Sequence, residues 1–316
     1  MDWSGRIDGE ERDVLRVHQI VKQMDLEKLL EEQETGKKVC FVSFNSDEGI
    51  IRNKGRIGAK DGWRELKHNL SSFPVLEDEI QFYDLEIPIE IEDNNLEKAQ
   101  EELSEIVKKL KEKNYLVVVL GGGHEIAYGT FTGIKKYAKS KEESPKIGIV
   151  NIDAHFDMRD YDKGCTSGTM FLQIADDCKK ENLKFNYNVF GIQKFSNTRR
   201  LFNKAETLGV NYVLASEMAD VNPDNVYKIL SENDYIHLTI CTDVFRITDA
   251  PGVSAPQPFG IDPRVGMKVI KTVCKHSKNL TVDVAEVNPK YDYDSRTSRL
   301  MSNIIYEIIL SHYSTF

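Results

Sequence analysis

Aspartate and histidine residues follow one apolar segment of this sequence at a spacing that could bind a metal ion. The segment IGIVNI leads directly into Asp153-Ala154-His155-Phe156-Asp157, so Asp, His and Asp recur at every second position. In an extended backbone, side chains at alternate positions face the same way. Two carboxylates and an imidazole buried side by side would be costly, because like charges repel and both anions lose solvation. A divalent metal ion is the natural compensation, and the alternative is a solvated loop with accidental spacing.

Two further candidate ligands follow the apolar segment YIHLTI. Cys241 and Asp243 are again two residues apart, and we expect their side chains to share a face. The alternative for Cys241 is a small buried apolar residue near a strand end. Later in the chain, TVDVAEVNP carries Asp283 and Glu286, which by themselves are more often ordinary surface carboxylates.

A glycine-rich turn supplies the other histidine. The segment YLVVVL runs into Gly121-Gly122-Gly123-His124-Glu125, and the glycines let the backbone turn sharply and approach a ligand closely. We expect His124 to point into the crevice at this strand end. Taken alone the turn is ambiguous, because it could also cradle a phosphate or hold His124 as a hydrogen-bonded residue at a helix start.

Together these segments form an oxygen and nitrogen donor set suited to Mn²⁺. Two ions could share carboxylates, and a water between them would lose its proton near neutral pH and become a hydroxide nucleophile. The candidate metal ligands are His124, Asp153, His155, Asp157, Cys241 and Asp243.

The elements that must position these residues alternate between short β-branched runs and longer charged segments, which is typical of β-α units around a parallel sheet. Each candidate cluster begins where a predicted strand ends, and open α/β sheets bind ligands there. A helix is predicted over residues 95–113, where apolar residues form one stripe. Strands are predicted at residues 38–44, 115–120, 147–152, 188–191, 212–214, 236–241 and 280–284.

Composition sets limits on the class of protein. The 316 residues are 40% hydrophobic and contain no Pro/Gly/Ser linker, so we expect a single domain over residues 1–316. A net charge of -9 argues against nucleic acid and anionic lipid as partners, because both require a basic face. No run of about 18 apolar residues and no signal-type N-terminus occurs, so we expect no membrane association and a cytoplasmic location. The five cysteines are widely spaced without a CxxC pair, and we expect most of them to be reduced.

The glycine-turn histidine, the Asp-x-His-x-Asp segment and the later acidic segment resemble, in order and context, the motifs of the arginase (ureohydrolase) superfamily. This resemblance implies a three-layer α/β/α fold with a mostly parallel central sheet. It also implies a small-molecule substrate and a homo-oligomer, either a trimer or a hexamer.

Further segments are similar to the formimidoylglutamase branch of that superfamily. They are SDEGIIRNKGRIGAKDGW (46–63), GGGHEIAYGTF, DAHFDMR, TSGTMF (166–171), GIQKFSNT (191–198) and APGVSAPQPFG (250–260). Gly123 stands where arginases commonly have Asp, which argues against arginase and agmatinase. The resemblance covers about residues 4–290 and implies hydrolysis of N-formimino-L-glutamate to L-glutamate and formamide, a step of histidine breakdown.

Such a substrate suggests roles for further residues. Asp157 or Glu286 could carry a proton to the departing nitrogen, and the two substrate carboxylates require arginine partners. Arg159 is the first candidate and Arg56 the second, although each could instead be an exposed ion-pair residue. The remaining substrate-binding candidates are Asn53, Ser167, Gly168 and Thr169, whereas Gln193 and Asn197 are expected to satisfy loop backbone.

Cys241 is the main departure from the superfamily pattern, because the superfamily usually has a metal-bridging Asp at this position. A thiolate prefers softer ions than Mn²⁺, so a single ion or a different one is an alternative to two Mn²⁺ ions. Two alternative functions stay open. One is hydrolysis of a guanidino compound such as agmatine, and the other is a metal-poor protein without catalysis.

Overall fold

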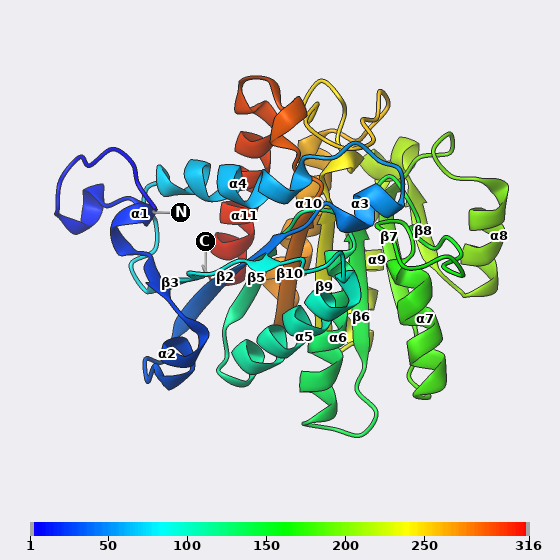
Figure 1. Cartoon of the computed structure of the whole chain (residues 1–316), viewed down its shortest axis with the longest axis horizontal. Helices are drawn as coiled ribbons and strands as arrows, with labels where there is room; N and C mark the ends of the chain where they lie inside the picture. Colours follow the sequence, from blue (N-terminus) through cyan, green and yellow to red (C-terminus); the bar gives the residue numbers. More distant parts are fainter. Residues whose placement is uncertain (1–2, 314–316) are drawn as a thin grey trace.

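A parallel β-sheet forms the centre of the protein in a computed structural model that describes residues 3–313 (Figure 1). All strand pairs within these residues are parallel. In spatial order the strands are β1 (Lys22–Met24), β3 (Ile80–Leu85), β2 (Lys37–Asn45), β5 (Leu116–Leu120), β10 (Asn279–Ala285), β9 (Tyr235–Cys241), β6 (Ile147–Ile152), β7 (Asn186–Ile192) and β8 (Asn211–Leu214), with β4 (Ile89–Glu90) paired to β2.

Helices cover both faces of this sheet, which gives the expected three layers (Figure 1). One face packs against α2 (Leu26–Glu31), α5 (Leu96–Glu112), α6 (Ile126–Lys139), α7 (Met170–Lys180) and α8 (Arg199–Thr207). The other packs against α1 (Val17–Ile20), α4 (Gly62–Ser71), α9 (Pro223–Glu232), α10 (Pro263–His276) and α11 (Arg296–Tyr313). Helix α3 (Glu48–Arg52) lies in the loop after β2, and 3-10 turns occupy Arg12–Val14, Ala59–Asp61, Ala215–Asp220, Thr242–Val244, Pro289–Tyr291 and Tyr293–Ser295.

Side chains of the central strands alternate between the two faces of the sheet, and helices bury both faces. On β9, Ile236, Leu238 and Ile240 join the core beneath the second set of helices. The intervening side chains point to the opposite face, where the ring of His237 lies 6.4 Å from that of Phe131 on α6. This second face of β9 therefore carries polar side chains toward the carboxyl end of the strand.

The seven predicted strands are confirmed, as is the helix predicted over residues 95–113, which forms α5. Asn95 caps α5 by accepting a hydrogen bond from the Lys98 amide. The prediction omitted β1, β3 and β4. Two of these are very short, and β3 contains Asp84, whose buried charge is paired with Lys67 at 2.5 Å.

One continuous sheet extends from β1 to β8. This arrangement supports the single domain predicted for residues 1–316, which we retain as a proposal. Among the helices of residues 3–313, none combines the length and the apolar character that crossing a bilayer would require.

Candidate metal centre

The carboxyl ends of β5, β6, β9 and β10 meet at one edge of the sheet, and the polar residues that follow them converge there. Register places Ala285 beside Cys241 and Ile152 beside Ile240, so the segments after these strands are adjacent. They enclose a cavity of about 100 Å³. Its lining consists of Asn53, His124, His155, Asp157, Arg159, Ser167, Ser196, Asn197, Leu201, Cys241, Asp243, Ser254, Ala255 and Glu286.

The glycine turn after β5 permits a close contact between backbones. The Gly122 amide donates to Phe44 O at 3.0 Å, and the Glu286 amide donates to Gly122 O at 2.8 Å. A Cβ atom at Gly122 would lie only 1.8 Å from Ser46 O, so no other residue fits there without displacing the backbone. The turn thereby places His124, which is 1% exposed, at the cavity.

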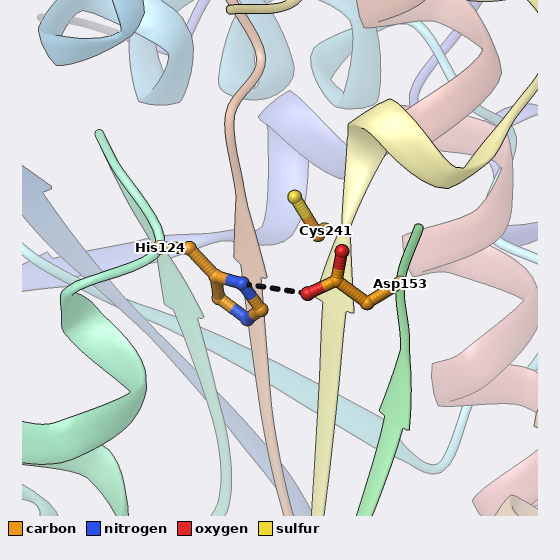
Figure 2. A group of neighbouring side chains, drawn as sticks. All are labelled: His124, Asp153 and Cys241. Atoms are coloured by element: carbon orange, nitrogen blue, oxygen red, sulfur yellow. Dashed lines mark ion pairs between the residues drawn. The ribbon is translucent and has the colours of Figure 1, made fainter. Parts of the chain in front are cut away.

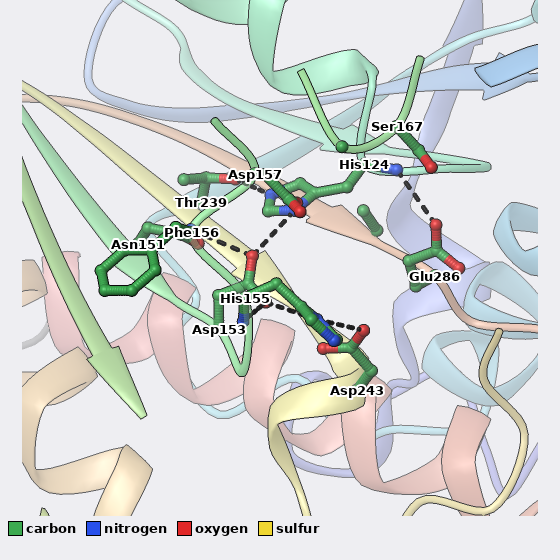
Figure 3. Close-up of polar contacts among 12 residues, drawn as sticks. His124, Asn151, Asp153, His155, Phe156, Asp157, Ser167, Thr239, Asp243 and Glu286 are labelled. Carbon is green, nitrogen blue, oxygen red and sulfur yellow. Dashed lines mark hydrogen bonds and ion pairs between the residues drawn. The ribbon is translucent and has the colours of Figure 1, made fainter. Parts of the chain in front are cut away.

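Two groups of potential metal ligands share Asp153. We call His124, Asp153 and Cys241 the cysteine group, and Asp153, His155 and Asp243 the aspartate group. Within each group the ligand atoms lie within 4.8 Å of one another. Figure 2 shows the cysteine group, and Figure 3 shows how Asp153 lies between the two histidines.

The two carboxylate oxygens of Asp153 face different histidines. Asp153 Oδ2 lies 3.1 Å from His124 Nδ1, and Asp153 Oδ1 lies 3.6 Å from His155 Nδ1. The His155 amide also donates to Oδ1 at 2.8 Å, which orients the carboxylate. On the far side, His155 Nδ1 lies 3.2 Å from Asp243 Oδ2. This geometry is that of a carboxylate placed to serve two neighbouring sites.

The backbone around these ligands differs from the extended one that the spacing predicted. Strand β6 ends at Ile152, and Asp157 adopts a left-handed φ of 48°, yet Asp157 Oδ2 lies 3.1 Å from His124 Nδ1. Thr242–Val244 forms a 3-10 turn, so Asp243 does not continue the extended strand that ends at Cys241, and the two residues belong to different groups although both line the cavity. The extended-backbone prediction was therefore wrong, because turns rather than strand alternation gather the ligands.

Asp283 and Glu286 are buried, which corrects the expectation of surface carboxylates. Glu286 has a left-handed φ of 68° and lines the cavity. Its Oε1 accepts from the His124 amide at 3.3 Å. Asp283 lies deeper, on β10, where it contacts His237 and Thr239. Non-glycine residues with left-handed φ are strained, and such strain is concentrated at functional sites.

Burial and mutual repulsion dominate the electrostatics of the site. Burial and the Asp153 charge raise the pKa of Asp157 to about 6. Burial, followed by the charges of Asp243 and Glu125, raises the pKa of Glu286 well above its usual value. Burial and the Asp153 charge likewise raise the pKa of the Cys241 thiol. Burial lowers the pKa of His124, but Asp153 and Asp157 outweigh it and raise that pKa overall.

These residues fit a divalent metal ion. Asp243 Oδ1 and Glu286 Oε2 are buried and accept no hydrogen bond from any residue of the described chain. An unpartnered buried carboxylate oxygen is costly, and a cation would satisfy it. Asp153 is fully buried, so the solvated-loop alternative does not apply to it. The donors are carboxylate oxygens, imidazole nitrogens and one thiol, which suit transition metals including Mn²⁺ and Zn²⁺.

The predicted substrate-binding residues divide into two sets. Arg159, Asn53 and Ser167 line the cavity, and Asn53 Nδ2 donates to Ser167 Oγ at 3.3 Å. Arg159 is exposed, and within residues 3–313 it is the one Lys or Arg among the lining residues. Its guanidinium therefore supplies positive charge at the cavity.

Arg56, Gly168 and Thr169 are not lining residues of this cavity. The Arg56 guanidinium donates to the backbone oxygens of Ser254 and Val253 and stacks on Tyr291. Thr169 Oγ1 hydrogen-bonds within its own loop and to Gln173, while the Gly168 backbone contacts Arg159. The loop 166–169 thus positions Arg159 and Ser167.

Ser196 and Ser254 also line the cavity and were not proposed as individual candidates. A serine in a long connection gives no periodic or spacing signal, although both lie in segments that carried the family resemblance. The prediction for Asn197 is confirmed, because its amide satisfies Ala154 O, Gln193 O and the Phe156 amide. Gln193 likewise donates to Phe259 O.

Comparison with known proteins places this arrangement in a family. The formimidoylglutamase of Fusobacterium nucleatum is 58% identical over 99% of this chain and 98% of its own length. That of Clostridium tetani is 40% identical over 97% and 93%. The crystal structure of the Bacillus subtilis formimidoylglutamase superposes with a TM-score of 0.80 at 21% identity, covering 98% of this chain and 95% of that one. The arginase family model matches residues 37–311, and the chain belongs to the arginase family.

Proposed function

We propose that this chain is a formimidoylglutamase, which hydrolyses N-formimino-L-glutamate to L-glutamate and formamide. Relatives of that name are 58% and 40% identical over nearly the whole chain. The observation that carries the proposal is that Asp153 belongs to both ligand groups at this cavity. Among the described residues that line the cavity, Arg159 is the one Lys or Arg. The ligand groups of such a cavity suit an amidine carbon, and its arginine suits a carboxylate.

We propose Mn²⁺ as the cofactor, with one ion in each ligand group. A solved structure of a Trypanosoma cruzi relative, the formiminoglutamase, contains Mn²⁺, and its TM-score to this chain is 0.76 at 22% identity. A bound Mn²⁺ ion would supply Lewis acidity, which lowers the pKa of a water molecule. His124 and Cys241 would hold one ion, His155 and Asp243 the other, and Asp153 would contact both, with Asp157 beside His124 as a further ligand.

The reaction adds one water and breaks the bond between the formimidoyl carbon and the glutamate nitrogen. That nitrogen must gain a proton as it leaves, and a carboxylate in the cavity can transfer it. We assign this role to Glu286 or Asp157, which both line the cavity. Glu286 is held in place through Oε1 by the His124 amide, while Oε2 has no partner within residues 3–313.

Arg159 is proposed to bind a carboxylate of the glutamate part. Its guanidinium has no hydrogen bond or ion pair with the described residues, and its backbone is held by Gly168 O at 2.9 Å. Asn53, Ser167, Ser196 and Ser254 offer neutral hydrogen-bond donors around the same cavity. Arg56 is not assigned to substrate binding, because its guanidinium already donates hydrogen bonds to the backbone oxygens of Ser254 and Val253.

Turnover by the purified, Mn²⁺-loaded chain tests the reaction. Formiminoglutamate should give formamide and glutamate in equal amounts, whereas arginine and agmatine should give no urea. Urea release from agmatine without turnover of formiminoglutamate would contradict the proposal and favour a guanidino hydrolase. Absence of turnover together with absence of bound metal would favour a protein without catalysis.

The role of Arg159 is tested by Arg159→Met. Loss of a charged hydrogen-bond partner costs about 1.5–3 kcal/mol, so KM should rise about 10–100-fold while bound metal is unchanged. Arg199→Met is the matched control, because Arg199 is also exposed and lies in α8 outside the cavity lining. Equal KM values for both variants would remove Arg159 from substrate binding.

Two predictions concern the state of the whole protein. We propose a homo-oligomer, a trimer or a hexamer, on the family resemblance alone, and light scattering measures it. A cytoplasmic location likewise stays a prediction.

A further inference from the structure

A file of buried polar side chains continues behind His124, away from the cavity. His124 Nε2 lies 2.8 Å from Thr239 Oγ1, and Figure 3 shows Thr239 against the imidazole ring. Thr239 Oγ1 in turn donates to Asp283 Oδ1 at 2.5 Å, and His237 Nε2 lies 2.5 Å from Asp283 Oδ2. Thr239, Asp283 and His237 are all fully buried and none of them lines the cavity.

The strands themselves create this file. His237 and Thr239 are alternate residues of β9, and register places Asp283 of β10 directly beside Thr239. Their side chains therefore project from the same face of the sheet, beneath α6. Cys241 is the next residue of β9 on this face, so the file ends at the proposed metal site.

The direction of the hydrogen bonds in this file is determined by chemistry. An ionised carboxylate only accepts, so Asp283 takes the single hydroxyl proton of Thr239 and a ring proton of His237. The Thr239 oxygen can then only accept from His124, which places a proton on His124 Nε2. Nδ1 is left as the nitrogen that faces Asp153 and Asp157.

We infer that Thr239 and Asp283 are positioning residues that hold His124 as the Nε2–H tautomer, with Nδ1 directed at the metal ion. This inference rests on the metal site of the proposed function, but not on the identity of the substrate. A histidine ligand is commonly fixed by a partner on its other ring nitrogen, and loss of that partner typically costs 10–100-fold in metal affinity.

Packing alone does not account for these residues. Polar groups buried in a sheet face are costly unless their hydrogen bonds are satisfied, and apolar residues of similar shape would fill the space more favourably. Of the neighbouring positions on the same face, Val117 and Ile149 are apolar, whereas Thr281 and Asn151 are polar and have no hydrogen bond to this file. The three residues of the file lie on β9 and β10, between β5, which precedes His124, and β6, which precedes Asp153.

Metal affinity of two isosteric variants tests the inference. Thr239→Val removes the hydroxyl at nearly constant volume and should raise the Kd for Mn²⁺ about 10–100-fold, whereas Thr239→Ser should restore tight binding. Thr281→Val is the matched control, because Thr281 is a fully buried residue of β10 whose Oγ1 has no hydrogen-bond partner in the described chain. Its Kd should equal that of the unmodified chain.

Asp283→Asn provides a second variant if Thr239→Val fails to fold. An amide no longer obliges Thr239 to donate, so the His124 tautomer loses its constraint and Mn²⁺ affinity should again fall. Circular dichroism and thermal unfolding establish that each variant tested is folded. Unchanged Mn²⁺ affinity in a folded Thr239→Val or Asp283→Asn protein would overturn the inference.

Nuclear magnetic resonance of the ¹⁵N-histidine-labelled, Zn²⁺-loaded protein reports the tautomer directly, because Zn²⁺ is diamagnetic. His124, assigned by comparison with His124→Asn, should carry its proton on Nε2, with a downfield shift that Thr239→Val removes and Thr239→Ser retains. A proton on Nδ1 in the unmodified chain would refute the inference. Neither measurement uses formiminoglutamate, so failure of the proposed reaction would leave this result interpretable.

Discussion

The cysteine group and the aspartate group share one carboxylate but differ in the ligand that each adds to it. The aspartate group offers two carboxylates and an imidazole, and Asp243 Oδ1 is buried without a partner among the described residues. The cysteine group has a thiol in place of the second carboxylate, and burial with nearby negative charge raises the pKa of that thiol. A cation must therefore displace a proton to bind the Cys241 sulfur.

This difference predicts an order of occupancy. Hard carboxylate ligands suit Mn²⁺, while a thiolate favours softer ions such as Zn²⁺ or Fe²⁺. Mn²⁺ should therefore bind the aspartate group first, and it should bind the cysteine group with lower affinity. Asp157, 3.1 Å from His124 Nδ1, adds carboxylate character to the cysteine group and partly offsets the thiol.

The largest effect is expected from Asp153→Asn, because Asp153 belongs to both groups. The amide removes the shared negative charge, so both ions should bind poorly. We expect kcat/KM to fall about 10⁴-fold, the order seen when one member of a catalytic unit is removed. Elemental analysis after gel filtration should find less than one metal ion per chain.

Asp160→Asn is the matched control for Asp153→Asn. Asp160 is exposed and pairs with Lys204 at 2.7 Å, outside both groups. Its metal content and activity should equal those of the unmodified chain. If Asp153→Asn retained two ions per chain, a shared carboxylate would not explain the site.

A smaller and more diagnostic effect is expected when the groups are damaged separately. Asp243→Asn should remove the tighter Mn²⁺ ion and lower kcat/KM by at least about 10²-fold, beyond the usual effect of losing an outer partner. Cys241→Ser should change the affinity of the tighter ion by less than about tenfold, or about 1.4 kcal/mol. Titration of metal-free protein with Mn²⁺ measures the two affinities, and turnover of formiminoglutamate measures kcat/KM. The reverse ranking would mean that Cys241, rather than Asp243, anchors the first ion.

The sequence predicted the fold well because several strands of the sheet are nearly all apolar and end in recognisable clusters. Segments such as residues 116–120 and 147–152 have no solvated face, so their burial could be inferred from composition alone. Strand β3 escaped prediction because its buried Asp84 is paired with Lys67, a residue of α4. A pairing between distant segments leaves no local pattern.

The candidate site was predicted in composition but not in conformation. Spacing identified Asp153, His155 and Asp157, yet their convergence depends on a turn in which Asp157 takes a left-handed φ. Spacing also could not separate Arg159, which reaches the cavity, from Arg56, whose guanidinium is held by backbone oxygens. Both arginines lie in loops, and tertiary contacts alone distinguish them.

The smallest expected effect, and the closest test of the comparison, is Cys241→Asp. This substitution makes the cysteine group chemically similar to the aspartate group, so Mn²⁺ affinity at the weaker site should rise about tenfold, or about 1.4 kcal/mol. The preference of the weaker site for Zn²⁺ over Mn²⁺ should fall, because a carboxylate replaces the soft ligand. Competition titrations with both metals measure the two quantities.

Cys178→Asp is not a suitable control, because Cys178 is buried in the core and a charge there would destabilise the fold. Cys241→Ser serves instead, since it removes the thiol without adding charge and should leave the weaker site weak. If Cys241→Asp and Cys241→Ser bound Mn²⁺ equally, the missing carboxylate would not be what distinguishes the two groups. The difference would then lie in Asp157, whose carboxylate already faces His124 and would complete the cysteine group without residue 241.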